Sequence, residues 1–337
     1  MGIFLRTKYP GLNQLDFVIT PDFDIIAAYS AKFGGEVQGN VLKIPPVIGE
    51  GILKRFNIAP DFKLVIHRYR VKDELVLNRI SSNIPFDLVT LIFNCNEVPV
   101  SISTGDKHVH VTKNTGFAVQ IASAALNSVT RFPANEDVFF TVVGLSVARL
   151  KGLLNTEVSN STLQYILSSP PGFLFYESMG LEVQKVIKEL ADADSQNELS
   201  ILYHTFKVQE LIYLLFERLS KRTPINHSPI YNDDIDKLFL IRSAVLSDLS
   251  KPPRLKELSK MVGISETKMK ELFKQVFGNS IYNFYQQARM QEAAVQLRKG
   301  GASVSEVGYG LGFTNLSHFS RLFERFHGVN PKKYSSV

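Results

Sequence analysis

The pattern of apolar and polar positions near the end of the chain predicts an amphipathic helix over residues 319–328 (FSRLFERFHG). Apolar side chains recur there at i, i+3, i+4 and i+7, at Phe319, Leu322, Phe323 and Phe326. Asn315 is a candidate N-cap, and Gly328 suits the left-handed backbone that ends a helix. Pro331 is expected to prevent an early restart. Most helices of this kind are ordinary structure, so the pattern alone does not indicate a function.

A second copy of the same pattern lies upstream, in residues 269–278 (MKELFKQVFG). At an offset of 50, the matched pairs are Met269 and Phe319, Leu272 and Leu322, Phe273 and Phe323, Val276 and Phe326, and Gly278 and Gly328. At an offset of 49, the preceding pairs are Leu255 and Val304, Leu258 and Val307, Val262 and Leu311, Gly263 and Gly312, and Ile264 and Phe313. Each copy therefore predicts two helices joined by a tight turn whose glycine can adopt positive φ. Two such copies in register indicate a pair of helix-turn-helix units.

The first part of the chain, residues 1–155, has a β-strand pattern. Short apolar or alternating runs at 62–71, 87–95, 107–113 and 138–147 are separated by Gly, Pro and Asn. We therefore expect an α+β protein with an N-terminal β-rich barrel or sandwich, a middle helical region, and a C-terminal all-α domain over residues 233–337.

Residues 156–222 are predicted to be helical, and residues 223–232 to be an interdomain linker because Pro and polar residues dominate there. The segment 199–219 is apolar around much of its circumference, so a helix there needs burial on more than one side. Packing within its own domain and contact with a twin helix in a homodimer are both compatible with this pattern.

Charge is distributed unevenly along the chain. Residues 232–337 hold 16 lysines and arginines against 10 aspartates and glutamates, whereas residues 1–231 hold 22 of each. The whole formal charge of +6 therefore lies in the last 106 residues, which is typical of a phosphate-binding surface. No apolar run reaches 18 residues, and one cysteine fits a reducing cytoplasm. We expect a cytoplasmic protein without a membrane span.

With these motifs, the region from about 233 to 334 resembles the DNA-binding domain of the AraC/XylS family of bacterial transcription regulators. The resemblance includes the Gly312-Phe313 pair, the Phe-Ser-Arg-x-Phe run that starts at Phe319, and the closing Pro331-x-x-Tyr334. One departure is Gly308, where the family usually has Ala, and it should loosen its helix by up to about 1 kcal/mol. The resemblance implies a cupin-like sensor barrel in the N-terminal part.

The resemblance also implies that the second helix of each unit enters the major groove, in two adjacent grooves about 34 Å apart. The residues at base-reading positions are Thr267, Lys270, Glu271, Ser317, Ser320 and Arg321. Arg321 can donate two hydrogen bonds to guanine, whereas Glu271 can accept from cytosine or pair with Lys268 or Lys274. The phosphate contacts are expected from Lys268, Lys274, Arg289 and Arg325. The helix-turn-helix framework is assigned to Gly263, Leu272, Phe273, Gly312, Phe313, Phe319, Phe323 and Pro331.

Candidate sites for chemistry in the N-terminal part are weak. His108 and His110 would face the same side of a strand, but no suitable third ligand follows them, and nothing in the sequence brings His67 near. Cys95 has no neighbouring His or basic cluster that would lower its pKa. We therefore expect no metal, no cofactor and no enzymatic activity.

The leading hypothesis is a homodimeric regulator that binds double-stranded DNA and responds to a small effector in the N-terminal barrel. The effector stays open between a siderophore, a sugar, an aromatic acid and a lipid. Two alternatives remain. One is a constitutive dimeric DNA-binding regulator, and the other is a metal- or cysteine-dependent enzyme fused to a DNA-binding domain.

Overall fold

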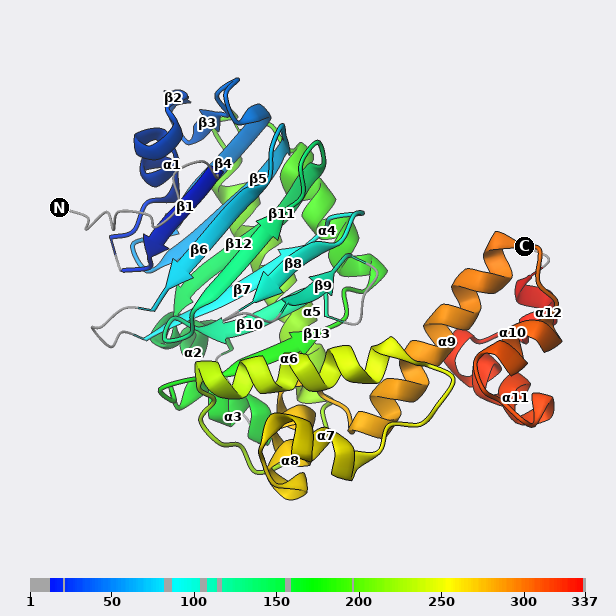
Figure 1. Cartoon of the computed structure of the whole chain (residues 1–337). Helices are drawn as coiled ribbons and strands as arrows, with labels where there is room; N and C mark the ends of the chain where they lie inside the picture. Colours follow the sequence, from blue (N-terminus) through cyan, green and yellow to red (C-terminus); the bar gives the residue numbers. More distant parts are fainter. Residues whose placement is uncertain are drawn as a thin grey trace. The chain divides into compact units, whose positions relative to one another are not determined.

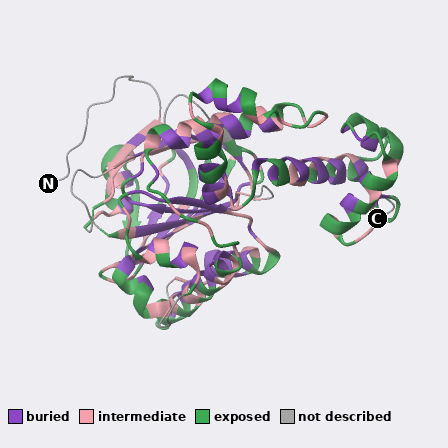
Figure 2. Ribbon diagram, turned by 90° about the horizontal axis from the view of Figure 1, so that it is seen from below, coloured by how far each residue is buried: buried purple, intermediate pink, exposed green. Residues whose placement is uncertain are grey.

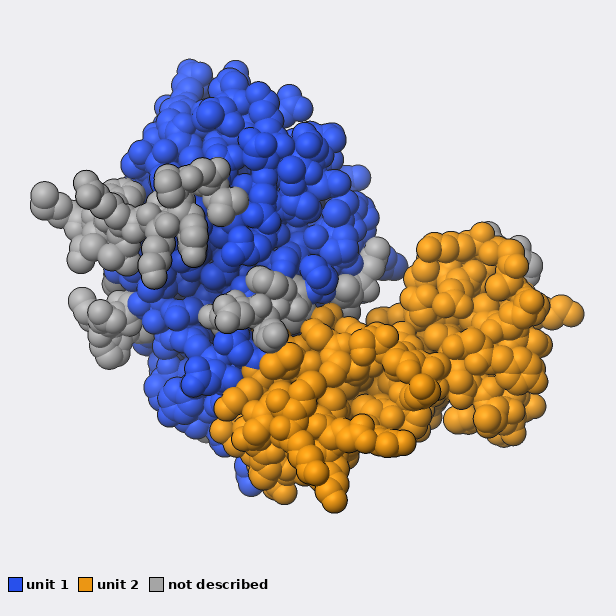
Figure 3. All heavy atoms as spheres, in the orientation of Figure 1, with its two compact units in different colours: residues 1–236 blue, residues 237–337 orange. Residues whose placement is uncertain are grey.

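The computed structural model divides the chain into two compact units, Met1–Asp236 and Lys237–Val337 (Figures 1 and 3). It describes residues 13–20, 22–81, 87–103, 108–113, 117–154, 159–195 and 197–335, with the side chains of residues 108 and 109 also outside the description. The first unit combines strands and helices and the second is helical. This is the α+β organisation that the sequence predicts.

The strands of the first unit form two sheets. One sheet has the order β1-β6-β11-β8-β9 and the other the order β13-β10-β7-β12-β5-β4-β3-β2. The strands are β1 (Asn13–Val18), β2 (Glu36–Gln38), β3 (Val41–Lys43), β4 (Gly49–Ala59), β5 (Phe62–Val71), β6 (Leu75–Ile80), β7 (Leu88–Asn94), β8 (Val100–Ser103), β9 (His108–Val111), β10 (Val119–Ser123), β11 (Ser128–Phe132), β12 (Asp137–Ser146) and β13 (Leu174–Glu177). All four predicted strand runs are confirmed, as β5, β7, β9 and β12.

In the middle of the eight-stranded sheet, the two faces have different surroundings. On β7, Val89, Leu91 and Phe93 belong to a hydrophobic core shared with helices. The alternate residues of the same strand, which include Thr90 and Asn94, line a cavity. Because successive side chains of a strand point to opposite faces, this alternation separates a fully apolar face from a mixed one. Figure 2 shows the interior of the sheets as buried.

Helices α2 to α5 cover the apolar face of this sheet. The helices of the first unit are α1 (Ile25–Phe33), α2 (Val147–Leu154), α3 (Ser161–Leu167), α4 (Leu181–Asp192) and α5 (Ser200–Ser220). Their buried side chains, such as Ile187 on α4 and Leu211 on α5, share one core with strand residues. The predicted helical region 156–222 is therefore part of the same compact unit as the sheets. It also contains a strand, β13, which pairs with β10 at the sheet edge.

The segment expected to be a linker, residues 223–232, is packed against the first unit. Ile230 is buried, and its backbone N–H donates to the carbonyl oxygen of Gly172 at 3.0 Å. The His227 ring stacks on Tyr165, with ring centroids 4.9 Å apart. The boundary between the two units falls a few residues later, within α6 (Asn232–Ser247).

The second unit continues with α7 (Leu255–Val262), α8 (Glu266–Phe277), α9 (Ile281–Lys299), α10 (Val304–Gly310), α11 (Leu316–His327) and α12 (Pro331–Tyr334). Helix α9 contacts α8 of the first helix-turn-helix unit and also α10, α11 and α12. Its 19 residues span about 28 Å at 1.5 Å per residue. It therefore connects the two helix-turn-helix units, α7–α8 and α10–α11 (Figure 1).

Helix α11 begins and ends as the sequence predicts, but the chain after it differs from the prediction at Pro331. The Asn315 side chain accepts from the His318 N–H at 3.1 Å, and Gly328 ends the helix with φ of 75°. Pro331, however, is the first residue of α12, and Asn330 caps that helix. The expectation that Pro331 prevents an early restart was wrong, because proline fits the first helical position, where its missing N–H is not needed.

Candidate functional site

The two helix-turn-helix units repeat each other in three dimensions as they do in sequence. The paired residues Leu272 and Leu322, and Phe273 and Phe323, are all buried. The side chain of Ser265 caps α8, as that of Asn315 caps α11. One pair differs: Val276 is buried, whereas its counterpart Phe326 is 40% exposed. Phe326 therefore continues the apolar stripe of α11 but, unlike Val276 in the first unit, is not covered by the core.

The turn glycines of the two units both have positive φ, but their surroundings differ. Gly263 has φ of 68° and Gly312 φ of 77°. A Cβ added to Gly263 would meet nothing within 4 Å, whereas one added to Gly312 would lie 1.8 Å from the carbonyl oxygen of Ser250. Gly312 is therefore required both by its conformation and by the close approach of the loop between α6 and α7.

Gly308, on α10, is also explained by packing. It is buried, and a Cβ there would lie 2.7 Å from Cδ2 of Leu316 and 3.2 Å from Cδ1 of Phe319. The missing side chain lets α10 and α11 approach closely. Phe319 and Phe313 then pack together, with ring centroids 5.2 Å apart.

The exposed face of α8 carries the residues predicted for DNA contact. Thr267, Lys268, Lys270 and Glu271 are exposed, and Lys274 is half-buried. Lys270 Nζ lies 3.7 Å from Glu266 Oε2 on the same helix. The structure therefore brings these five residues together on the solvent side of one helix.

The exposed face of α11 is built in the same way. Ser317, Arg321 and Arg325 are exposed, and Ser320 is half-buried. These residues lie opposite the buried Phe319 and Phe323. Each unit thus presents one polar helix face that its own core does not occupy.

Arg289 does not have the position expected of a phosphate contact. It is buried, and its Nε and Nη2 donate to the carbonyl oxygen of Leu311 at 3.1 and 2.6 Å. Its guanidinium also lies 3.6 Å above the ring centroid of Phe313. Burial lowers the pKa of Arg289. The expectation was wrong because the side chain holds α9 to the turn of the second unit, a contact that sequence spacing does not reveal.

The second unit is basic. Residues 237–337 hold 16 lysines and arginines against 7 aspartates and glutamates, a formal charge of +9. Two helix-turn-helix units on a connecting helix, each with an exposed polar second helix and a basic surrounding, define a DNA-binding domain.

Comparison with known proteins identifies the type of this domain. A protein family described as "Helix-turn-helix domain" matches residues 258–336. The C-terminal part of the chain is an AraC-type helix-turn-helix domain. This confirms the resemblance found in the sequence.

The curated relatives are transcription regulators that match less than half of the chain. The transcriptional activator RhaR of Mannheimia succiniciproducens is 24% identical over 156 residues, which are 46% of this chain and 55% of RhaR. The regulator GbdR of Pseudomonas aeruginosa is 25% identical over 158 residues, which are 47% of this chain and 42% of GbdR. The matched segments therefore span about half the length of these relatives.

Two solved structures resemble the chain, both with low TM-scores. A regulator with an AraC-type DNA-binding domain from Chromobacterium violaceum is 23% identical and covers 31% of this chain and 92% of its own, with a TM-score of 0.29. ToxT of Vibrio cholerae is 13% identical and covers 81% of this chain and 97% of its own, with a TM-score of 0.32. Scores of this size carry no argument about function.

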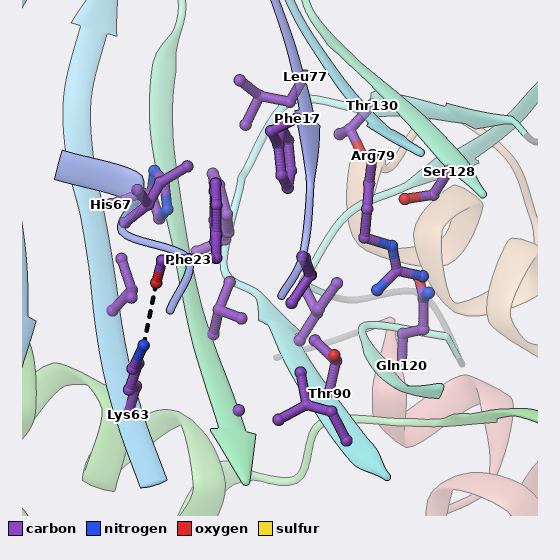
Figure 4. A pocket seen from close by; sticks show the side chains of 18 of the residues that line it. Phe17, Phe23, Lys63, His67, Leu77, Arg79, Thr90, Gln120, Ser128 and Thr130 are labelled. Carbon is purple, nitrogen blue, oxygen red and sulfur yellow. Dashed lines mark hydrogen bonds between the residues drawn. The ribbon is translucent and has the colours of Figure 1, made fainter. Parts of the chain in front are cut away.

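The first unit contains a cavity of about 530 Å³ between its two sheets. Its walls come from both sheets, with Leu77 and Arg79 on β6, Ser128 and Thr130 on β11, and Thr90 and Ile92 on β7. Figure 4 shows several of these side chains pointing into the cavity. Cavities of this size are typical of small-molecule sites.

His67 and Cys95 are not placed for metal binding or nucleophilic chemistry. His67 is buried against Phe140, and burial lowers its pKa to about 3. Burial also raises the pKa of the Cys95 thiol to about 12, so it is not a thiolate at neutral pH. His110 is exposed on β9, and the side chain of His108 lies outside the described residues. Among the residues described, no three His, Cys, Asp or Glu side chains gather as a metal site.

In the described part of the chain, none of the helices combines the length and the apolar character needed to cross a membrane.

Proposed function

We propose that this protein is a sequence-specific transcription regulator that binds double-stranded DNA through α8 and α11. The observation that carries the proposal is the pair of polar helix faces on one basic domain, each opposite its own buried core. Such faces fit the major groove, where side chains can reach base edges. The curated relatives, RhaR and GbdR, are named as transcription regulators, which supports the same function.

In this proposal, base edges are read by Thr267, Lys270, Glu271, Ser317, Ser320 and Arg321. All are at least partly exposed. Phosphates are contacted by Lys268, Lys274 and Arg325, which fix the register of the domain on DNA without reading sequence. The protein then acts in the cytoplasm of a bacterium, where the chromosome lies.

We further propose that the cavity between the two sheets is an effector site. It is lined by residues of the first unit, not of the DNA-binding domain, and its walls combine apolar and polar side chains. An effector changes DNA binding only if it has different affinities for two conformations of the protein. Regulation through this cavity therefore requires that the effector and the DNA each bind one of these two conformations more tightly than the other.

The proposed homodimer would form through α5. One side of this helix packs in the core of the first unit, through residues such as Val208, Leu211 and Leu215. Another side exposes Leu202, Phe206 and Tyr213, and the N-cap residue Leu199 is exposed next to them. These four positions are separated by three, four and seven residues, which is one or two helical turns, so they lie along one stripe. Large apolar side chains gathered in this way are typical of an interaction surface.

The experiment that tests DNA recognition is a selection from random duplex DNA with the full chain, at two salt concentrations. Enrichment of a site with two sub-sites about ten base pairs apart, weakened by salt, is expected if both recognition helices engage adjacent grooves. Enrichment of a single short sub-site would mean that only one helix reads DNA. Binding without any enriched sequence would contradict sequence-specific regulation in the absence of an effector.

A further inference from the structure

Arg79 is a buried cation without a hydrogen-bond partner. Its side chain extends from β6 into the cavity and is 4% exposed. None of its three guanidinium nitrogens has an acceptor among the described residues. Burial lowers the pKa of Arg79 to about 10, so the group is still protonated at neutral pH. A buried charge that is not paired is strongly destabilising, which suggests that an anion completes this site.

The other cationic side chains of the cavity wall already have partners. Arg55 forms an ion pair with Asp24. Lys63 Nζ donates to the carbonyl oxygen of Phe23 at 3.0 Å (Figure 4). Among the described lysines and arginines that line the cavity, Arg79 is thus the one whose charge no protein group balances.

Polar side chains from two other strands surround the guanidinium. Ser128, on β11, is paired in register with Arg79, and Thr130 lies two residues further on the same face. Gln120, on β10, extends toward Arg79 from the opposite sheet (Figure 4). Its Oε1 accepts from the Tyr176 hydroxyl at 3.4 Å, which leaves the amide hydrogens to donate to a ligand. The site therefore offers hydrogen-bond donors around one positive charge.

The remainder of the cavity is mainly apolar. Phe17 and Leu77 lie on the same sheet as Arg79, and Ile92, Phe140 and Val142 line the facing sheet. Such walls fit a hydrocarbon or aromatic body and disfavour a sugar, whose many hydroxyls would lose hydrogen bonds to water without replacement. One unbalanced guanidinium also matches one negative charge, and its planar fork fits a carboxylate.

We propose that the cavity binds an apolar monocarboxylate, whose carboxylate pairs with Arg79 beside Gln120 and Ser128 and whose body fills the apolar part. This inference rests on the proposed effector site and names the chemical class of the effector.

The test measures the melting temperature of the full chain with three monocarboxylates, octanoate, dodecanoate and 2-naphthoate, and with their primary amides. A ligand that binds the folded state raises the melting temperature, so at least one carboxylate is expected to do so more than its amide. Arg79→Met should remove this preference and lower carboxylate affinity by about 10- to 100-fold. Arg79→Lys, which keeps the charge, should retain the preference. Thr90→Val removes another unpaired polar group of the wall but no charge, so it can change affinity for both ligands alike and should keep the preference for the carboxylate over its amide.

The outcomes separate the ligand class from the proposed function. Equal shifts by carboxylate and amide, or a preference that survives Arg79→Met, would overturn the carboxylate assignment while leaving an effector cavity in place. No shift with any of the six compounds would also overturn it. If Arg79→Met does not fold, loss of the preference in Arg79→Lys contradicts the proposal and its retention supports it. A carboxylate that binds through Arg79 but leaves DNA affinity unchanged would keep the site and contradict its role as an effector site.

Discussion

At the scale of single residues, Arg321 and Lys274 allow base reading and phosphate contact to be told apart. Both lie on recognition helices, Arg321 exposed on α11 and Lys274 half-buried on α8. We expect Arg321→Ala to cost about 1–3 kcal/mol of binding free energy and to relax the preference at one base position, because a bidentate contact to guanine is lost. The measurement is the selected sequence profile of the variant beside that of the unmodified chain.

Lys274→Ala is the matched control for this change. A phosphate contact adds affinity on every sequence, so its loss should weaken all sites alike and reduce the salt slope of binding by about 1. An unchanged sequence profile with Arg321→Ala, or a changed profile with Lys274→Ala, would contradict the assignment of the two roles.

The two turn glycines give a stability prediction at the same scale. Gly263→Ala should destabilise its unit by about 1–2 kcal/mol. Alanine is disfavoured in the left-handed backbone conformation, but its Cβ would meet no neighbouring atom. Gly312→Ala should cost more, about 2–5 kcal/mol, because its Cβ would also overlap the Ser250 carbonyl oxygen. Native-state hydrogen exchange of α7–α8 and of α10–α11 measures the two local free energies of unfolding. Equal costs at the two positions would show that the Ser250 contact is not maintained.

At the scale of elements, Arg289 fastens α9 to the second helix-turn-helix unit. Arg289→Met should lower the free energy of unfolding by about 2–4 kcal/mol, because the Leu311 carbonyl loses two charge-assisted donors. It should also weaken DNA binding by disordering α10 and α11. Thermal melting and the salt slope of DNA binding are the two measurements.

If Arg289 instead contacts a DNA phosphate, the opposite result is expected. In that case the variant keeps its melting temperature, and only its salt slope falls by about 1. Lys274→Ala, measured in parallel, shows what the loss of a proposed phosphate contact looks like in the same assay.

At the scale of the whole molecule, the exposed stripe of α5 predicts a dimer. Phe206 is 62% exposed near the middle of this stripe. Phe206→Asp should shift the protein from dimer to monomer, because a charge placed in an apolar interface is not solvated. Analytical ultracentrifugation of the full chain gives the mass of each species.

Leu181→Asp, on α4, serves as the control for Phe206→Asp. Leu181 is also a large exposed apolar residue, but it lies outside the stripe of α5. This variant should remain a dimer. A monomeric unmodified protein would contradict the dimer outright, and a dimer that persists with Phe206→Asp would place the interface elsewhere.

Much of the second unit could be predicted from sequence because its interactions are local. Helix periodicity, caps and the turn glycines are set by residues three to four positions apart, and the duplicated pattern made the two units visible. The strand runs at β5 and β12 were visible for a similar reason, because their apolar character and the breakers between them are local.

Tertiary structure alone decided the features that depend on which distant residues meet. The basic composition of the second unit suggested that Arg289 is a surface cation. Its guanidinium instead donates to the carbonyl oxygen of Leu311, 22 residues away in the sequence. The pairing of β13 with β10 and the packing of residues 223–232 likewise depend on long-range contacts. Arg79 is the clearest case. The sequence contains no sign that its strand faces a cavity, because alternation shows that a strand has two faces but not which one lines a cavity.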